Sequence, residues 1–196
     1  MIKLTTKQLK QIIKEELRLL TENTGIPELD SLLAEDNVES IIQGLELAES
    51  FGAPIDYQSL LISKSEKILK DLAKSPAGSR MPELLHNIAK VSTLFSTLVS
   101  IARNPVVLPE TLEMLGSLEG VNYSNIVVHV AGNPSTPIEM LLKLSKHKTA
   151  FVRRAVARRD DVPDDILREL ITDSSENVKR AAQETLNKRM SGPFIA

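Results

Sequence analysis

The chain has 196 residues, enough for one domain with a buried core, and its 42% hydrophobic and 26% charged residues are typical of a folded globular protein rather than a disordered one. It contains no cysteine, which excludes disulfides and Cys-ligated zinc or iron–sulfur centres. No run approaches the roughly 20 apolar residues of a membrane span, and the N-terminus has no signal-peptide pattern. We therefore expect a cytoplasmic protein with no membrane partner.

The net charge of −2 is unevenly distributed along the chain. Residues 1–20 carry a net charge of +3, residues 21–138 carry −8, and residues 139–196 carry +3. A basic C-terminal third beside an acidic middle would attract an anionic partner, although an ordinary solvated surface can have the same composition.

Residues 5–20 show the spacing of an amphipathic helix, and residues 23–27 (NTGIP) would end it. We therefore separate residues 1–22 from the remainder as an N-terminal helix. One face of this helix, a candidate docking surface, carries the apolar residues Leu9, Ile12, Ile13, Leu17 and Leu20.

Three roles for this helix remain open. It would cap one end of a repeat array, dock in a partner's groove, or lie on a membrane surface. The absence of aromatic residues in the segment argues against the membrane role. The run KLTTKQLKQIIKEEL also resembles N-terminal segments of some bacteriophage proteins, which implies the virion as a second location if the chain is phage-derived.

An internal repeat is the clearest pattern in the sequence. An alanine preceded by an apolar residue recurs at separations of 25, 29, 29, 26 and 25 residues. Repeats of this length are typical of stacked helical units, because one unit alone cannot bury its apolar faces. The six positions, here called the anchor alanines, are Ala48, Ala73, Ala102, Ala131, Ala157 and Ala182.

Each repeat contains signals for two helices. The first helix is expected to end at the anchor alanine, because an Asn-Pro or similar pair follows it, and the second to begin at the next proline. In one repeat, Thr136, Pro137 and Glu139 fit the N-cap, N1 and N3 positions of a capping box. Asp173 and Glu176 predict the same arrangement for the last helix.

The run VAGNPSTPIEMLLKLSKHKTAFVRRAVARR resembles the leucine-rich repeat variant family. The match is close over residues 126–160 and looser over 72–125 and 161–187, and residues 146–189 also resemble HEAT-type repeats. Such a resemblance implies a superhelix of helical units that binds partners. A described member of the variant family holds an iron–sulfur centre on an N-terminal cysteine cluster, a function that a chain without cysteine does not share.

These observations together predict an all-α fold. We expect a right-handed α-solenoid of about five to six two-helix repeats, each of 25–29 residues, over residues 23–190. The amphipathic N-terminal helix precedes it and a tail over residues 191–196 follows.

No catalytic motif is recognisable. The three histidines, His86, His129 and His147, lie in different repeats without a metal-ligand spacing. The acidic residues of segment 160–165 flank a predicted helix start, where negative charge is favourable without any catalytic role. We therefore expect no enzyme activity, no metal and no cofactor.

One basic cluster is a candidate anion-binding or partner-binding stripe. Pairs of basic residues recur 26 residues apart, so that stacked repeats would align them along a phosphate backbone. The alternative is a structural ladder in which these side chains pair with Asp160, Asp161 or Glu184. The six residues are Arg153, Arg154, Arg158, Arg159, Lys179 and Arg180.

The sequence thus favours a non-enzymatic protein-binding or structural scaffold, such as an assembly or virion-associated component. The alternative is a nucleic-acid-binding repeat protein that uses the basic stripe. A repair-type enzyme on a HEAT-like scaffold is a third hypothesis, which lacks a catalytic acid in any recognisable motif.

Overall fold

The structure is a computed structural model, and it describes residues 26–191. The predicted amphipathic helix over residues 5–20 and the tail after residue 191 lie outside the described residues.

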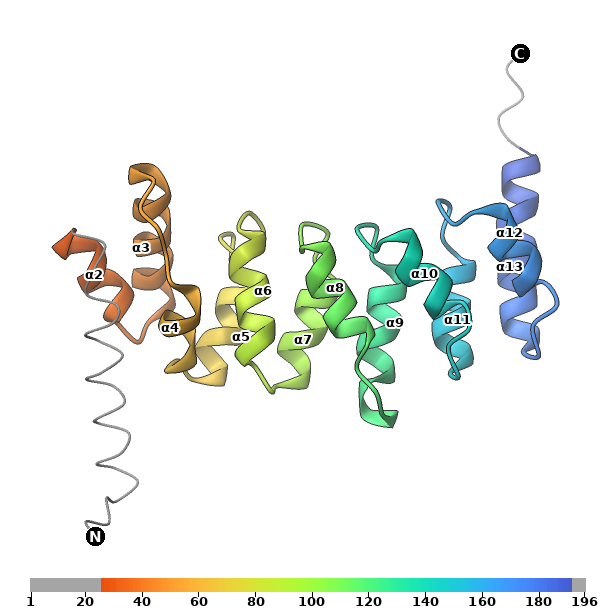
Figure 1. Cartoon of the computed structure of the whole chain (residues 1–196), viewed down its shortest axis with the longest axis horizontal. Coiled ribbons are helices and arrows are strands. Elements are labelled where there is room, and N and C mark those ends of the chain that lie inside the picture. The colour runs from red at the N-terminus through yellow and green to blue at the C-terminus, as the bar shows by residue number, and fades with distance from the viewer. Residues whose placement is uncertain (1–25, 192–196) are drawn as a thin grey trace, which may run out of the picture. The chain divides into compact units, whose positions relative to one another are not determined.

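The predicted all-α class is confirmed over the described residues, which form twelve α-helices, one 3₁₀ helix and no strand (Figure 1). The first five helices are α2 (Pro27–Ala34), α3 (Val38–Phe51), α4 (Tyr57–Ile62), α5 (Glu66–Lys74) and α6 (Pro82–Val91). The next are α7 (Phe95–Ala102), α8 (Pro109–Gly116), the 3₁₀ helix η1 (Val121–Tyr123) and α9 (Ser124–Gly132). The last are α10 (Ile138–Leu144), α11 (Ala150–Ala157), α12 (Asp164–Leu170) and α13 (Glu176–Met190).

The anchor alanines occupy every second helix, one each in α3, α5, α7, α9, α11 and α13. All six are at most 4% exposed. A small side chain at this position lets the backbone of a neighbouring helix approach closely, and a larger one would have no space. The helices between them bury apolar pairs such as Met140 with Leu141 and Ile166 with Leu167.

The chain divides into two compact units, residues 1–97 and residues 98–196. In the first unit, α3 packs against α2 and α5, and α4 packs against α6. A glycine permits the first of these contacts, since a Cβ at Gly44 would lie 2.7 Å from Cδ2 of Leu33 on α2. The core of this end of the unit contains Leu29, Ile41 and Leu45.

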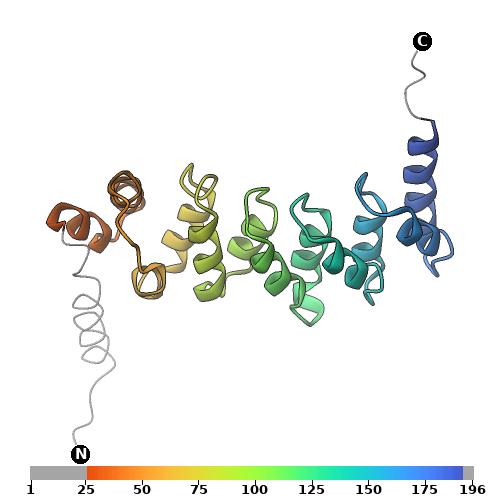
Figure 2. The same ribbon diagram turned by 45° about the horizontal axis from the view of Figure 1, so that its top comes forward.

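In the second unit, helices that are two apart in the chain lie side by side. Helix α11 packs against both α9 and α13, and α10 packs against α8, as Figures 1 and 2 show. Each of α8, α10 and α12 also contacts the helix that follows it in the chain. Helices α9, α11 and α13 therefore form one row, and α8 and α10 pack against each other beside it.

Prolines mark the starts of the second helices, as predicted. Pro82 and Pro109 are the first residues of α6 and α8, whereas Pro137 and Pro163 immediately precede α10 and α12. The capping box predicted at Thr136 is wrong. Its hydroxyl donates instead to the carbonyl of Val130, at 2.5 Å, because the buried loop brings it against the end of α9.

The tight packing around the anchor alanines gives a first prediction. Ala131→Leu should lower the free energy of unfolding by about 1–3 kcal/mol, because the extra atoms have no space in a packed core. The neighbouring Gly132→Ala should instead be neutral or stabilise by up to about 1 kcal/mol, since an added Cβ there meets no atom within 4 Å. Urea unfolding followed by circular dichroism measures both. Equal midpoints for the two variants would contradict the role of the anchor position.

Candidate functional site

The six basic residues of the predicted stripe all lie in the second unit. Arg153 and Arg154 belong to α11, Arg158 and Arg159 follow it, and the two remaining residues belong to α13. Their side chains fall into two groups, because two of the arginines bind other parts of the fold.

Arg153 joins α11 to the loop before α13. Its Nε and Nη2 donate to the two carboxylate oxygens of Asp173, at 2.6 and 2.8 Å, and its Nη1 donates to the carbonyl of His147 at 2.7 Å. Both side chains of the ion pair are largely buried, at 13% and 8% exposed. The guanidinium holds the pKa of Asp173 below its ordinary value.

The capping box predicted for Asp173 and Glu176 is therefore wrong. Helix α13 begins after Ser175, and Asp173 accepts the backbone N–H of Ser175 at 2.7 Å. Its carboxylate closes the turn before the helix while it binds the arginine.

Arg159 is buried, at 7% exposed, and its guanidinium lies against the end of α9 in the preceding repeat. It donates to the carbonyls of Ala131, Asn133 and Pro134. Its charge is balanced by Asp161, whose carboxylate lies 2.5 Å away. This arginine thus supplies donors to the carbonyls with which the neighbouring helix ends.

The same kind of contact recurs elsewhere in the second unit. The side-chain amide of Asn133 donates to the carbonyls of Ala102 and Asn104, both at 2.8 Å. The hydroxyl of Thr185 donates to the carbonyl of Ala157 at 2.7 Å. In each case a side chain of one repeat donates a hydrogen bond to a carbonyl at the end of the first helix of the preceding repeat.

We call these contacts the carbonyl ladder, defined by the donors Asn133, Arg159 and Thr185. Sequence reasoning did not find it, although a signal was present. Asn133 and Arg159 each stand two residues after an anchor alanine. Asparagine and arginine differ chemically, so the signal in the sequence was their shared position after the anchor alanine and not their residue type.

The first unit contains a comparable contact. The Nζ of Lys64 donates to the carbonyl of Glu35 at 2.8 Å and lies 3.1 Å from a carboxylate oxygen of Asp36. Its side chain is only 4% exposed. The end of α2 is therefore held by the loop that connects α4 to α5.

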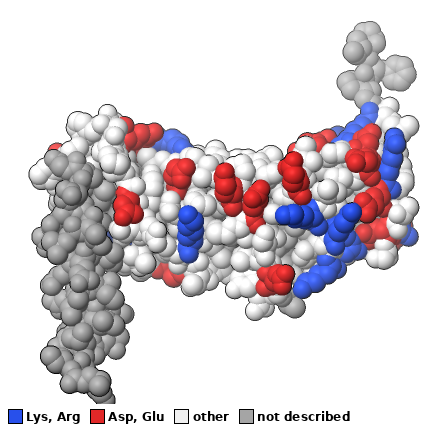
Figure 3. Space-filling model, in the orientation of Figure 1, with Lys and Arg blue, Asp and Glu red and all other residues white. Residues whose placement is uncertain are grey.

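The other four stripe residues are less constrained. Arg158 and Arg180 are exposed, and Arg154 is half-buried. Lys179 pairs with Glu176 at 3.4 Å, and Arg180 donates to the side chain of Asn177 at 2.9 Å. On the face of the second unit seen in Figure 3, acidic and basic side chains are interleaved rather than separated.

The acidic residues of segment 160–165 also have structural partners. Asp160 pairs with Lys188 at 2.6 Å, and Asp164 pairs with Arg189. Asp164 and Asp165 occupy the first turn of α12, where the helix dipole favours negative charge, as predicted. Among the described residues, no group of three His, Cys, Asp or Glu side chains could hold a metal ion.

Large apolar side chains are exposed in both units, and two of those in the second unit lie on the same helix. Ile138 and Leu142 lie one turn apart on α10, and they are 55% and 46% exposed. Phe151, in the first turn of α11, is 68% exposed. We call Ile138 and Leu142 the α10 surface.

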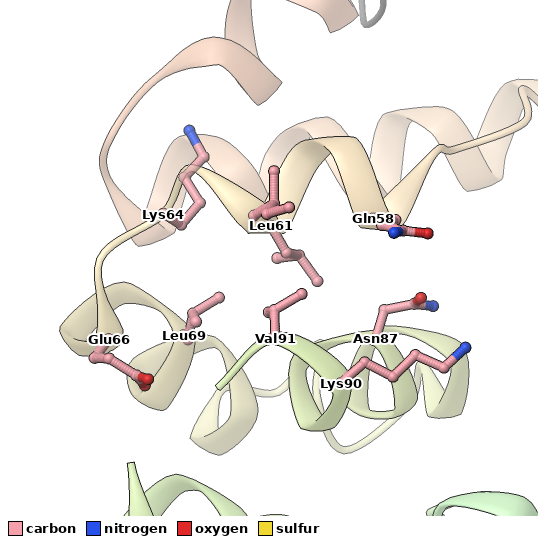
Figure 4. Close-up of a pocket in the computed structure, with 9 residues that line it drawn as sticks. Gln58, Leu61, Lys64, Glu66, Leu69, Asn87, Lys90 and Val91 are labelled. Carbon is pink, nitrogen blue, oxygen red and sulfur yellow. The ribbon is translucent and has the colours of Figure 1, made fainter. Parts of the chain in front are cut away.

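A groove lies between α4 and α6 in the first unit, with a volume of about 610 Å³ (Figure 4). Leu61, Leu69 and Val91 supply its apolar lining. Gln58 and Asn87 face each other at one end of it. The groove combines an apolar floor with polar ends, which is the usual character of a binding site.

Comparison with known proteins gives no relative. No protein-family model, no curated protein and no solved structure matches this chain. The resemblance to leucine-rich repeat variants stays a prediction. Within the described part of the chain, no helix has the length and apolarity needed to cross a membrane.

The carbonyl ladder gives a second prediction. Arg159→Ala should lower the free energy of unfolding by about 2–3 kcal/mol, because it leaves buried carbonyl groups without donors. Arg158→Ala is the matched control, since the adjacent arginine is exposed and its removal should change the free energy of unfolding by less than about 0.5 kcal/mol. Urea titration of both variants measures the difference. A loss as small for Arg159→Ala as for the control would show that the ladder does not stabilise the fold.

The pair of Arg153 and Asp173 predicts a pH dependence. The folded-state pKa of Asp173 is lowered, so its contribution to stability is complete above its unfolded pKa of about 4 and is lost as the pH falls through the lower folded value. Asp173→Asn should therefore flatten the fall in urea midpoint below about pH 4. Arg153→Gln should flatten it similarly, and the double variant should flatten it no further. Unchanged pH profiles in both single variants would contradict this assignment.

Proposed function

We propose that this chain is a non-enzymatic protein-binding scaffold built on helical repeats, arranged as a right-handed solenoid of the leucine-rich repeat variant type. Six buried alanines in alternate helices support the repeat architecture. Repeat proteins of this kind offer extended surfaces to partners rather than catalytic centres.

The observation that carries the proposal is the α10 surface. Ile138 and Leu142 are exposed, while Met140 and Leu141 of the same helix are buried in the fold. At the equivalent positions of the next repeat, 26 residues further on, the chain has Asp164 and Arg168. The scaffold therefore does not require apolar side chains there, which points to a partner that covers them.

The charges around the α10 surface indicate the chemistry of that partner. Glu110 and Glu113 are exposed on α8, which packs against α10, and Glu139 is exposed on α10 itself. Lys143 is also exposed on α10, and Figure 3 shows acidic and basic side chains interleaved on this unit. A protein segment that presents apolar side chains flanked by lysine or arginine would complement this surface.

The nucleic-acid alternative uses the basic stripe. Binding to a phosphate backbone depends on exposed lysine and arginine side chains. Arg153 and Arg159 are directed to Asp173 and to backbone carbonyls, which leaves Arg158 and Arg180 as the exposed members. The stripe therefore offers fewer charges to a phosphate backbone than the sequence suggested.

The fourth prediction tests the α10 surface with a designed helical peptide that carries leucines one turn apart with lysines beside them. The full-length protein should bind this peptide, and Ile138→Ser with Leu142→Ser should weaken binding at least about tenfold, since each buried apolar side chain contributes about 1.5–3 kcal/mol. Isothermal titration calorimetry measures both affinities. A peptide with glutamate in place of each lysine should bind more weakly, because acidic side chains flank the surface.

Met190→Ser is the matched control, because Met190 is 84% exposed and lies on α13. It should leave peptide affinity unchanged. Equal binding by the α10 double variant and this control would overturn the proposed surface. Salt-sensitive retention of duplex DNA that is lost in Arg158→Ala with Arg180→Ala would instead favour the nucleic-acid alternative.

A further inference from the structure

We propose that the groove between α4 and α6 binds the chain's own amphipathic segment, residues 5–20, with Leu17 and Leu20 in the groove. This site lies in the first unit, whereas the α10 surface lies in the second, so the inference is independent of the proposed partner site.

Part of the groove lining is apolar. Leu61 and Leu69 are at most 3% exposed and form part of its lining, and Val91 is half-buried. Ile62 also lines the groove and is 57% exposed. In Figure 4 the side chains of Leu69 and Val91 point into the space beneath α4. An occupant that covers Ile62 would remove this exposed apolar surface from water.

The polar residues around the groove suit an amphipathic occupant. The amides of Gln58 and Asn87 face each other at one end, and the Nδ2 of Asn87 donates to the carbonyl of Glu83 at 2.9 Å. An apolar centre bordered by polar groups matches a helix that has one apolar face and polar flanks. The sequence predicts such a face for residues 5–20, made of Leu9, Ile12, Ile13, Leu17 and Leu20.

The segment is tethered close to the groove. Lys64 lines the groove, and its Nζ lies 3.4 Å from the carbonyl oxygen of Ala34, the last residue of α2. Helix α2 has eight residues and is therefore about 12 Å long. The five residues 21–25 span up to about 17 Å, which is enough to reach from the start of α2 to the ammonium group of Lys64.

The volume of the groove and the reach of residues 21–25 together favour the last turn of the segment as the part that docks. A space of about 610 Å³ falls in the range of ligand pockets and is smaller than a whole helix. Leu17 and Leu20 are three residues apart and are the two residues of the predicted apolar face that are nearest the tether.

Charge complementarity supports the same occupant. Residues 1–20 carry five basic and two acidic side chains, a net charge of +3. The described part of the first unit, residues 26–97, carries six basic and eleven acidic side chains, a net charge of −5. Opposite net charges favour association of the segment with its own unit, whereas the charged residues that line the groove itself are Lys64, Glu66 and Lys90.

Crosslinking in the full chain tests the inference, because a chain without cysteine accepts single reactive sites cleanly. Glu16→Cys is combined with Lys90→Cys at the groove, and a short bismaleimide is added. The control pair replaces Lys90→Cys by Lys74→Cys, an exposed site in the same unit that does not line the groove. The groove pair should form the intramolecular crosslink at least about fivefold faster, because docking raises the effective concentration at that site.

Leu17→Ser with Leu20→Ser, added to the groove pair, should slow the crosslink to the rate of the control pair. Circular dichroism verifies that each variant remains folded, and these substitutions leave the described core intact. Equal rates for the groove and control pairs, or a rate that the leucine changes do not alter, would overturn the inference.

Crosslinked dimers without the intramolecular product would place the segment on a second copy and overturn docking within the chain. Ile138→Ser with Leu142→Ser should leave crosslinking unchanged. Failure of the α10 peptide experiment and failure of this experiment are therefore distinguishable.

Discussion

The last carbonyl groups of a helix have no hydrogen-bond partner within that helix. The packing of the second unit depends on the side chains that donate hydrogen bonds to these carbonyls. The helices that carry the anchor alanines Ala131 and Ala157 have nine and eight residues, so the unpaired groups are a large share of each. The carbonyl ladder supplies donors from the following repeat. The bonds that complete one helix therefore also fix the position of its neighbour.

This use of polar side chains changes what the basic residues of the C-terminal third can do. Arg159 binds carbonyls within the fold, and Arg153 binds a buried carboxylate, so neither guanidinium is presented to a partner. A regular spacing of basic residues therefore reflects the repeat itself as much as any ligand. Surfaces available for binding lie where the repeats differ from one another, as Ile138 and Leu142 differ from Asp164 and Arg168.

The two candidate surfaces make different demands on an occupant. The α10 surface is exposed on one helix, with Glu139 on α10 and two glutamates on α8 exposed, which would suit a separate basic and apolar segment. The groove between α4 and α6 is partly open to solvent, and Lys64 in its lining contacts the end of α2. Proximity of the groove to the tether at α2 favours an occupant from the same chain, because a tethered segment has a high effective concentration.

The sequence by itself determined the all-α class, the burial of the six anchor alanines and the prolines that begin the second helices. These features depend on local backbone chemistry and on a small side chain that recurs once in each repeat, and both can be recognised in a single sequence. The tertiary structure alone decided the partners of Thr136, Arg159 and Asp173. A hydroxyl, guanidinium or carboxylate can bond locally or across repeats with similar energy, so its partner depends on which groups the neighbouring repeat places within reach.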